Sequence, residues 1–313
     1  MTGKVQIVPA DSAGIAAAAA LLRAGQPVAV PTETVYGLAA RADSAEAVAA
    51  IYRAKGRPSF NPLIVHVVSL EQAVQIATFD HRAHKLAQAF WPGALTLVLP
   101  LREAARIAPA VTAGLSTIAL RCPAHPAMRA LLAETGLPLA APSANRSGGV
   151  SPTTAEHVAA SLAGRIPLVL DGGACMAGLE STIVALRGNA TWQLLRQGPI
   201  DAGQITAILG SLPDVMTRPE IEAPGQLARH YSPGKPVRLD AVEARPDEFL
   251  IGFGAVTGEV SLSPVGDLAE AAARLYACLH QAEAATQPKV AVAPIPDQGI
   301  GAALNDRLRR AAA

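Results

Sequence analysis

The sequence predicts an α/β protein in which a large mixed β-sheet flanked by helices is followed by a smaller α/β domain. Short runs rich in Val, Leu and Ile alternate with helical patterns along most of the 313 residues, as expected for buried strands connected by helices. Hydrophobic residues make up 50% of the chain, whereas 4% are aromatic and 16% are charged. The core is therefore predicted to be aliphatic, and disorder is excluded.

Helices in the first part of the chain are predicted from apolar periodicity together with capping residues. Ser44 is a good N-cap, and Gly25, Gly56 and Gly136 stand where helices are expected to end, because glycine readily adopts the left-handed conformation that closes a helix. The predicted helices cover residues 15–24, 44–54, 70–77, 82–90, 126–134, 155–162 and 202–209.

Strands are predicted where short aliphatic runs lie between turn residues. They cover residues 28–30, 63–67, 95–99, 117–121, 137–141, 168–170, 183–186 and 192–195. The last of these strands follow one another without an intervening helix, which favours hairpins. The sheet is therefore expected to be mixed rather than purely parallel.

A proline-rich linker is the clearest boundary in the chain. Residues 213–236 contain five prolines and lack apolar periodicity, which predicts an extended segment able to fold over a site as a lid. It separates a domain at 1–212 from a small α/β domain at 237–313. In the small domain, strands are expected at 237–239, 249–253 and 290–293 and helices at 268–283 and 302–312.

Charge and cysteine content exclude several classes of protein. The net charge of +1 gives no overall attraction to nucleic acid or membranes. Residues 1–212 carry 16 basic and 12 acidic side chains and the remainder 10 and 13, so an anionic ligand is expected in the first domain. Three scattered cysteines fit neither a disulfide framework nor a zinc module. Without a leader pattern or an apolar run of ~18 residues, we expect a cytoplasmic protein with no membrane partner.

Polar groups gather where predicted strands and helices end. Residues 31–38 place hydroxyls, including Thr34, and a carboxylate between apolar neighbours. Lys55 and Arg57 flank a glycine, so both cations can converge on one polyanion. His66 lies within a strand. Each has a plain structural alternative, namely a capped turn, a solvated helix C-terminus and a core histidine.

Further polar loops follow the later strands. Residues 142–148 and 151–153 combine hydroxyls, an amide and free N–H groups before a helix, which suits a phosphate or nucleotide. Arg121 and Arg196 end predicted strands, and Arg229, His230 and Tyr231 lie in the linker. Together these segments indicate an enzyme that handles a nucleotide or another polyanion.

Three other chemistries are not supported by the sequence. Cys175 has no histidine nearby in sequence to activate it as a nucleophile. The histidines have no metal-ligand spacing, which excludes a zinc site. The short GxG at 299–301 is better explained by a tight turn than by a dinucleotide.

Taken together, the motifs resemble the L-threonylcarbamoyladenylate synthase family, in its longer form with an additional C-terminal domain. They run in family order and are PTETVYGL (31–38), KGRP (55–58) with Asn61, LIVHV (63–67), WPGALTLVL (91–99), STIALRCP (116–123), APSANRSG (141–148) with Ser151, ESTIV (180–184), LLRQG (194–198) and RHYSPGKP (229–236). The resemblance implies an open, twisted mixed sheet flanked by helices, followed by a small Rossmann-like domain.

The resemblance also implies an activity. L-Threonine, bicarbonate and ATP would become threonylcarbamoyl-AMP and pyrophosphate, with Mg²⁺ bound through the ATP phosphates and no metal ligand from the protein. The product would serve the N6-threonylcarbamoyladenosine modification of tRNA through separate threonylcarbamoyl-transferase proteins. A direct contact with tRNA or double-stranded RNA is a further expectation.

Site residues follow from the same resemblance, position by position. The residues implied for L-threonine are Thr34, His66, Arg121, the backbone at Ala141, and Ser181. The residues implied for ATP are Lys55, Arg57, Asn61, Thr117, Ser143, Asn145, Ser151 and Arg196, with His230 and Tyr231 from the linker.

Two alternative functions remain at this point. One is carbamoyl transfer in hydrogenase maturation, although three scattered cysteines cannot build the zinc modules of such proteins. The other is an RNA-binding module. Residues 223–227 read Ala-Pro-Gly-Gln-Leu where the family often has serine and methionine, which affects the expected lid contacts rather than the main site.

Overall fold

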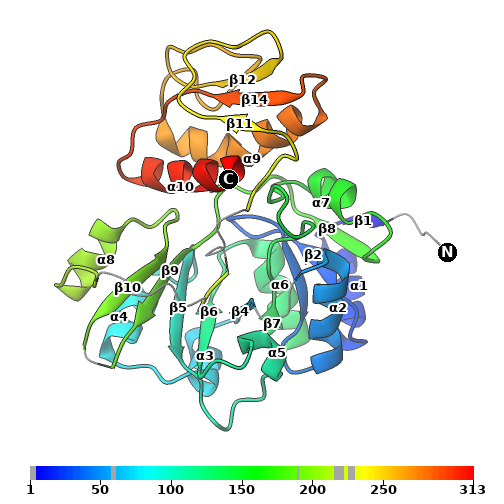
Figure 1. The fold of residues 1–313 in the computed structure, drawn as a ribbon. Helices are drawn as coiled ribbons and strands as arrows, with labels where there is room; N and C mark the ends of the chain where they lie inside the picture. Colours follow the sequence, from blue (N-terminus) through cyan, green and yellow to red (C-terminus); the bar gives the residue numbers. More distant parts are fainter. Residues whose placement is uncertain (1–4, 58–60, 189, 215–221, 225–229) are drawn as a thin grey trace.

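The computed structural model describes residues 5–57, 61–188, 190–214, 222–224 and 230–313. Within these residues, ten strands form one sheet in the N-terminal domain and four form a second sheet in the C-terminal domain. Figure 1 shows the C-terminal domain stacked on one side of the N-terminal domain. The parts of KGRP and RHYSPGKP that include Pro58 and Arg229, and much of the predicted linker, lie outside the described residues.

The large sheet is mixed, as predicted. Its order is β1-β8-β2-β3-β7-β4-β6-β5-β9-β10. Strands β4 and β6 are parallel, whereas β7 is antiparallel to β4, and β9 and β10 form the predicted hairpin. The strands are β1 (Gln6–Pro9), β2 (Val28–Val30), β3 (Gly37–Arg41), β4 (Ile64–His66), β5 (Leu95–Pro100), β6 (Thr117–Arg121), β7 (Leu139–Ala140), β8 (Leu168–Asp171), β9 (Thr182–Leu186) and β10 (Trp192–Arg196).

Helices cover both faces of this sheet. Successive residues of β2 and β8 enter different hydrophobic cores: Ala29 and Val169 belong to one, whereas Val28 and Leu168 belong to the other. Alternation of this kind is the geometry of a strand buried on both faces. The helices are α1 (Ser12–Arg23), α2 (Ala45–Lys55), α3 (Leu70–Ile76), α4 (His81–Phe90), α5 (Pro109–Thr112), α6 (Pro126–Thr135), α7 (Ala155–Ser161) and α8 (Ala202–Leu209).

The C-terminal domain is a small parallel α/β unit. Its strands β11 (Val237–Arg238), β12 (Glu248–Gly252), β13 (Val260–Ser261) and β14 (Lys289–Val292) pair in the order β11-β14-β12-β13, and every pair is parallel. Helices α9 (Leu268–Ala284) and α10 (Ile300–Ala312) lie between this sheet and the N-terminal domain (Figure 1). Two elements of the C-terminal domain are therefore placed where they can reach the larger domain.

Four short elements were not predicted: β1, β3, β13 and α5. Strand β3 reads Gly-Leu-Ala-Ala-Arg, and glycine and alanine have low strand propensity. It becomes a strand because antiparallel pairing with β2 and β7 buries it. The strand predicted at 137–141 pairs only over Leu139–Ala140. Among the described residues, no helix combines the length and hydropathy needed to cross a bilayer.

Gly198 allows the segment after β10 to pack closely on the segment before β9. A Cβ at this position would lie 2.5 Å from the Thr182 backbone nitrogen and 2.6 Å from the Glu180 carbonyl oxygen. We predict that Gly198→Ala lowers the free energy of unfolding by about 1–3 kcal/mol, because overpacked backbone cannot relax cheaply. Urea denaturation measures this. Gly188→Ala is the matched control, since its Cβ would meet no atom within 4 Å, and equal stability of the two variants would contradict the packing argument.

Candidate active site

A buried cavity lies over one face of the central strands β4 and β6. Ile64 and His66 point to this face of β4, and Arg121 lies at the end of the neighbouring β6. The loops that follow β2 and β7 and precede β9 supply further walls. The lining residues are Thr32, Thr34, Val35, Gly37, Arg57, Ile64, His66, Arg121, Ala141, Pro142, Ser143, Glu180, Ser181, Arg196, Pro224, His230 and Tyr231.

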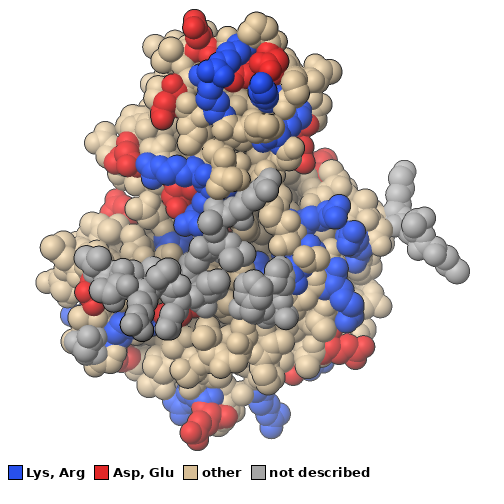
Figure 2. Space-filling model, in the orientation of Figure 1, with Lys and Arg blue, Asp and Glu red and all other residues tan. Residues whose placement is uncertain are grey.

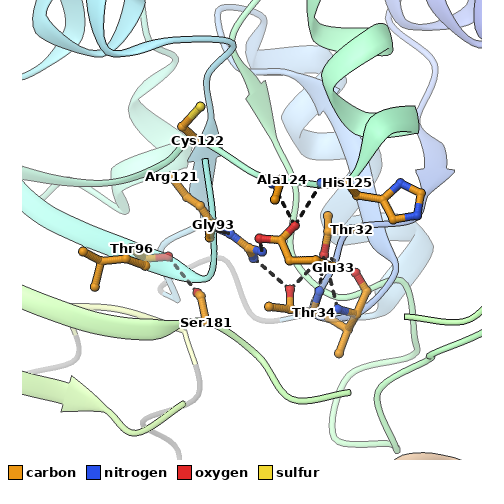
Figure 3. A network of polar contacts seen from close by, with 12 residues as sticks. Thr32, Glu33, Thr34, Gly93, Thr96, Arg121, Cys122, Ala124, His125 and Ser181 are labelled. Atoms are coloured by element: carbon orange, nitrogen blue, oxygen red, sulfur yellow. Dashed lines mark hydrogen bonds and ion pairs between the residues drawn. The ribbon is translucent and has the colours of Figure 1, made fainter. Parts of the chain in front are cut away.

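Arg121 is fixed at one end of the cavity by a network of polar contacts (Figure 3). Its Nη1 donates to Thr34 Oγ1 at 2.8 Å, its Nε to the Gly93 carbonyl at 3.0 Å, and its Nη2 to Glu33 Oε1 at 2.5 Å. Glu33 also accepts from the backbone N–H of Ala124. The guanidinium has five N–H groups, so two remain without a partner among the described residues.

Glu33 keeps this end of the cavity close to electrical neutrality. Burial alone would raise the pKa of Glu33, but the charge and hydrogen bond of Arg121 hold it below the ordinary value. The carboxylate is therefore ionised at neutral pH. Glu33 was not among the predicted site residues, although its place among the hydroxyls of residues 31–38 was the available signal.

His66 is a neutral group in the cavity wall. Burial, with a smaller contribution from the charge of Arg121, lowers the pKa of this imidazole to about 3. Its Nδ1 is buried and has no hydrogen-bond partner among the described residues. His66 is therefore suited to exchange a hydrogen bond with a bound molecule rather than to supply positive charge.

The basic side chains of Lys55, Arg57 and Arg196 gather on the other side of the cavity. Lys55 Nζ donates to the Ser143 and Asn145 carbonyls, both at 2.5 Å, and burial lowers its pKa well below the usual value. Arg57 donates to the Pro62 carbonyl at 3.2 Å, and burial lowers its pKa to about 10. Arg57 therefore stays charged at neutral pH and faces the cavity.

Arg196 and Ser181 line the cavity on the same side as Arg57. Arg196 donates to the Ser181 carbonyl and hydroxyl, each at 3.0 Å, and to the Pro224 carbonyl at 3.2 Å. Ser181 Oγ also lies 2.7 Å from Thr96 Oγ1. These contacts hold a described part of the linker against the cavity.

Glu180 is a second buried carboxylate that the sequence reasoning missed. It accepts from Ser151 Oγ at 2.7 Å, and from Tyr276 and Arg307 of the C-terminal domain at 2.8 and 2.9 Å. Burial would raise the pKa of Glu180, but Arg307, Arg196 and the Ser151 hydrogen bond lower it to about 2. The available signal was a carboxylate placed two residues before the buried strand β9.

Unpartnered polar atoms concentrate at the predicted site. Among the described residues, the buried side-chain nitrogens and oxygens without a hydrogen-bond partner are Arg57 Nε, Asn61 Oδ1, His66 Nδ1, His230 Nδ1 and Tyr231 Oη. Every one of these residues was assigned to the site from the sequence. Because a buried polar group without a partner is costly, these atoms are prepared for a polar ligand.

The predicted site residues fall into three groups by position. Those that line the cavity are Thr34, Arg57, His66, Arg121, Ala141, Ser143, Ser181, Arg196, His230 and Tyr231. Lys55, Asn61, Asn145 and Ser151 are buried directly behind its wall. Thr117 lies at the opposite end of β6 from Arg121, outside the lining, but on the same face of the strand because side chains alternate.

Cys175 is buried, and burial raises its pKa to about 12. This agrees with the sequence argument against a nucleophilic role, because the thiol is protonated at neutral pH. Among the described residues, no three His, Cys, Asp or Glu side chains are grouped as metal ligands.

The fold and cavity define a class of protein. It is a two-domain α/β protein with a cationic small-molecule site between a mixed sheet and the described part of the linker, which contributes Pro224, His230 and Tyr231. Residues 20–198 match the family described as "Telomere recombination", and residues 200–313 match the family described as "Threonylcarbamoyl-AMP synthase, C-terminal domain". The chain belongs to the threonylcarbamoyl-AMP synthase family, which is a family of enzymes.

Relatives with this name cover nearly the whole chain. Threonylcarbamoyl-AMP synthase of Bacillus subtilis is 41% identical over 324 residues, covering 95% of this chain and 92% of that protein. The Pyrococcus abyssi enzyme is 38% identical over 322 residues, covering 94% and 92%. The crystal structure of P. abyssi Sua5 complexed with L-threonine matches with a TM-score of 0.88 at 35% identity and covers 98% of both chains.

The ionised state of Glu180 makes stability depend on pH. Because its folded pKa of about 2 lies below the ordinary 4.5, its contribution is present above pH 4.5 and is lost as pH falls toward 2. At about 1.4 kcal/mol per unit, this amounts to about 3 kcal/mol. We predict that the stability difference between the wild type and Glu180→Gln shrinks by this amount between pH 5 and pH 2. Urea denaturation at several pH values measures it, and a difference that does not change with pH would contradict the assignment.

Proposed function

We propose that this chain joins L-threonine, bicarbonate and ATP to give threonylcarbamoyl-AMP and pyrophosphate. The observation that carries the proposal is the division of one buried cavity into two ends. One end has a guanidinium held by a carboxylate, as suits an amino acid, and the other gathers cations, as suits a polyphosphate. The relatives' shared name and the threonine-bound P. abyssi structure support the same reading.

L-Threonine would bind at the Arg121 end. The two N–H groups of Arg121 that remain available can hold the substrate carboxylate as a charge-assisted pair. Thr34, His66 and Ser181 offer hydroxyl and imidazole groups around it, and the backbone at Ala141 completes the wall. Glu33 would keep Arg121 in place while the substrate comes and goes.

ATP would bind at the cationic end. Arg57 and Arg196 would neutralise phosphate oxygens, while Lys55 holds the loop of Ser143 and Asn145 in position. Ser151 and Asn61 extend this end of the site, and Thr117 lies farther along the same face of β6. Phosphoryl chemistry of this kind depends mainly on positioning and charge neutralisation.

The reaction balances without a covalent enzyme intermediate. The threonine amine and bicarbonate give a carbamate and water. A carbamate oxygen then attacks the α-phosphorus of ATP in line, a new P–O bond forms, and pyrophosphate leaves with the electrons of the broken P–O bond. His230 and Tyr231, which line the cavity from the linker, would exclude water from the reactive anhydride.

Mg²⁺ is proposed as part of the ATP substrate. One oxygen each of Glu33 and Glu180 accepts from an arginine, and the other accepts from a backbone N–H or a hydroxyl, so they do not offer a free carboxylate pair to a metal. When bound, Mg²⁺ would neutralise phosphate charge beside the residues of the cationic end.

The product would serve the N6-threonylcarbamoyladenosine modification of tRNA through separate transferase proteins. A direct RNA contact is supported by basic side chains on the flank formed by α2 and α7 (Figure 2). Arg53, Arg146 and Arg165 are exposed there, and Arg165 donates to a carbonyl in the last turn of α2. A cytoplasmic location remains part of the proposal, and three unpaired, buried cysteines support it.

The first experiment measures pyrophosphate release and identifies the adenylate by mass. Purified protein with Mg²⁺ and ATP should release pyrophosphate only when both L-threonine and bicarbonate are present, because the attacking carbamate needs both. ATP binding without turnover, together with tight, salt-sensitive tRNA binding, would instead favour the RNA-binding module.

Arg57 provides a residue-level test. We predict that Arg57→Gln lowers kcat/KM for ATP at least about 100-fold, because a buried cation facing the phosphates is lost. Arg53→Gln should leave kcat/KM within about twofold, since Arg53 is exposed in the last turn of α2, four residues before Arg57. Circular dichroism checks that both variants fold, and unchanged turnover by folded Arg57→Gln would remove Arg57 from the ATP site.

A further inference from the structure

Each of the three side-chain nitrogens of Arg307, in the C-terminal domain, makes a polar contact beside the cavity. This arginine of α10 is 0% exposed. Its Nε donates to Glu180 at 2.9 Å and its Nη2 to the Gln197 carbonyl at 2.7 Å, while Nη1 contacts its neighbour Asp306 at 2.6 Å. Two of these three contacts cross from one domain to the other, 110 and 127 residues apart in sequence.

Tyr276 of α9 converges on the same carboxylate. Its hydroxyl lies 2.8 and 3.0 Å from the two oxygens of Glu180. Glu180 also accepts from Ser151, a residue of the proposed ATP end, and itself lines the cavity. The C-terminal domain thus supplies two of the three side chains that orient a carboxylate in the cavity wall.

Arg307 and Tyr276 also contact the ring of Tyr231. The guanidinium of Arg307 lies 5.3 Å from the centre of the Tyr231 ring, and the ring of Tyr276 stacks on it at 5.6 Å and 29°. Tyr231 has a φ of 64°, which is unfavourable for a residue other than glycine. Its ring is buried, and its hydroxyl has no hydrogen-bond partner among the described residues. The surrounding contacts therefore fix a strained residue at the cavity.

Backbone packing brings the two domains together next to Glu180. Gly178 has a φ of 67°, and a Cβ at this position would lie 2.3 Å from the Ala272 carbonyl oxygen and 2.5 Å from Ala273 Cα in α9. The segment that carries Glu180 is therefore pressed directly against the C-terminal domain.

We propose that Arg307 and Tyr276 are positioning residues for ATP, acting through Glu180, Ser151 and Tyr231. The assignment rests on the proposed function, in which Ser151 and Tyr231 belong to the ATP end of the site, and Glu180 bonds to Ser151 and lines the cavity. The threonine end is built differently, because Arg121 is held by Glu33, Thr34 and the Gly93 carbonyl, all within the N-terminal domain. Loss of either positioning residue should therefore lower the affinity for ATP and leave the affinity for L-threonine unchanged.

The test compares Arg307→Met and Tyr276→Phe with the wild type. We expect the Kd for a non-hydrolysable ATP analogue and the KM for ATP to rise about tenfold or more, while the Kd for L-threonine alone changes less than about twofold. Arg307→Lys should restore part of the ATP affinity, since it keeps the charge near Glu180. Calorimetry gives the binding constants and steady-state kinetics the KM values.

Arg238→Met is the matched control. Arg238 pairs with Glu248 at 2.6 Å inside the C-terminal domain. The Arg238→Met variant therefore tests whether breaking an ion pair of that domain lowers ATP affinity merely by destabilising the domain. The positioning role would be overturned if Arg307→Met lowered the affinities for ATP and for L-threonine equally. It would also be overturned if the ATP affinity simply followed Tm across all variants. Unchanged ATP affinity in both variants would overturn it as well.

The variants also separate this inference from the proposed function. Tyr276→Phe removes one oxygen and keeps the ring, so it decides the question if Arg307→Met does not fold. If the wild type makes no threonylcarbamoyl-AMP but binds the ATP analogue, the proposed function fails and analogue affinity still tests the positioning role. A wild type that binds no ATP analogue would overturn both.

Discussion

Buried positive charge is the constraint on which the rest of the site depends. Arg57, Arg121 and Arg196 are each at most 8% exposed around one cavity, and buried charges are tolerated only with partners. Glu33 neutralises Arg121, whereas Arg57 and Arg196 are satisfied largely by backbone carbonyls. The cations therefore fix the loops that surround them, and the positive charge that remains is available to an anionic ligand.

The fold was predictable wherever local signals and packing agree. Helix α2 begins after Ser44, whose side chain caps Ala47, and ends at Gly56 with a φ of 60°; both signals are visible in the sequence. Strand β3 was not predictable, because its alanines form a strand only when β2 and β7 provide partners. Pairing between segments distant in sequence leaves no local signature in a weakly strand-forming run.

The candidate site could be predicted where its residues stand in recognisable motifs. Arg57, His66 and Tyr231 were identified from motifs, and each has a buried polar atom without a partner. Glu33 and Glu180 were missed because their partners are arginines far away in sequence, at 121 and 307. A carboxylate that orients another residue has no motif of its own, so its role becomes visible only when the chain is folded.

The Glu180–Arg307 pair is better explained by geometry than by stability. Removing both charges from water costs about as much as their attraction returns, so an apolar pair of similar volume could stabilise the interface as well or better. An apolar pair, however, could not orient Ser151 through a shared carboxylate or hold a cation over the Tyr231 ring. The directional bonds fix one arrangement of the two domains in which these side chains meet the cavity. The C-terminal domain therefore supports the wall of the cavity, although the residues that face the cavity belong to the first domain and the linker.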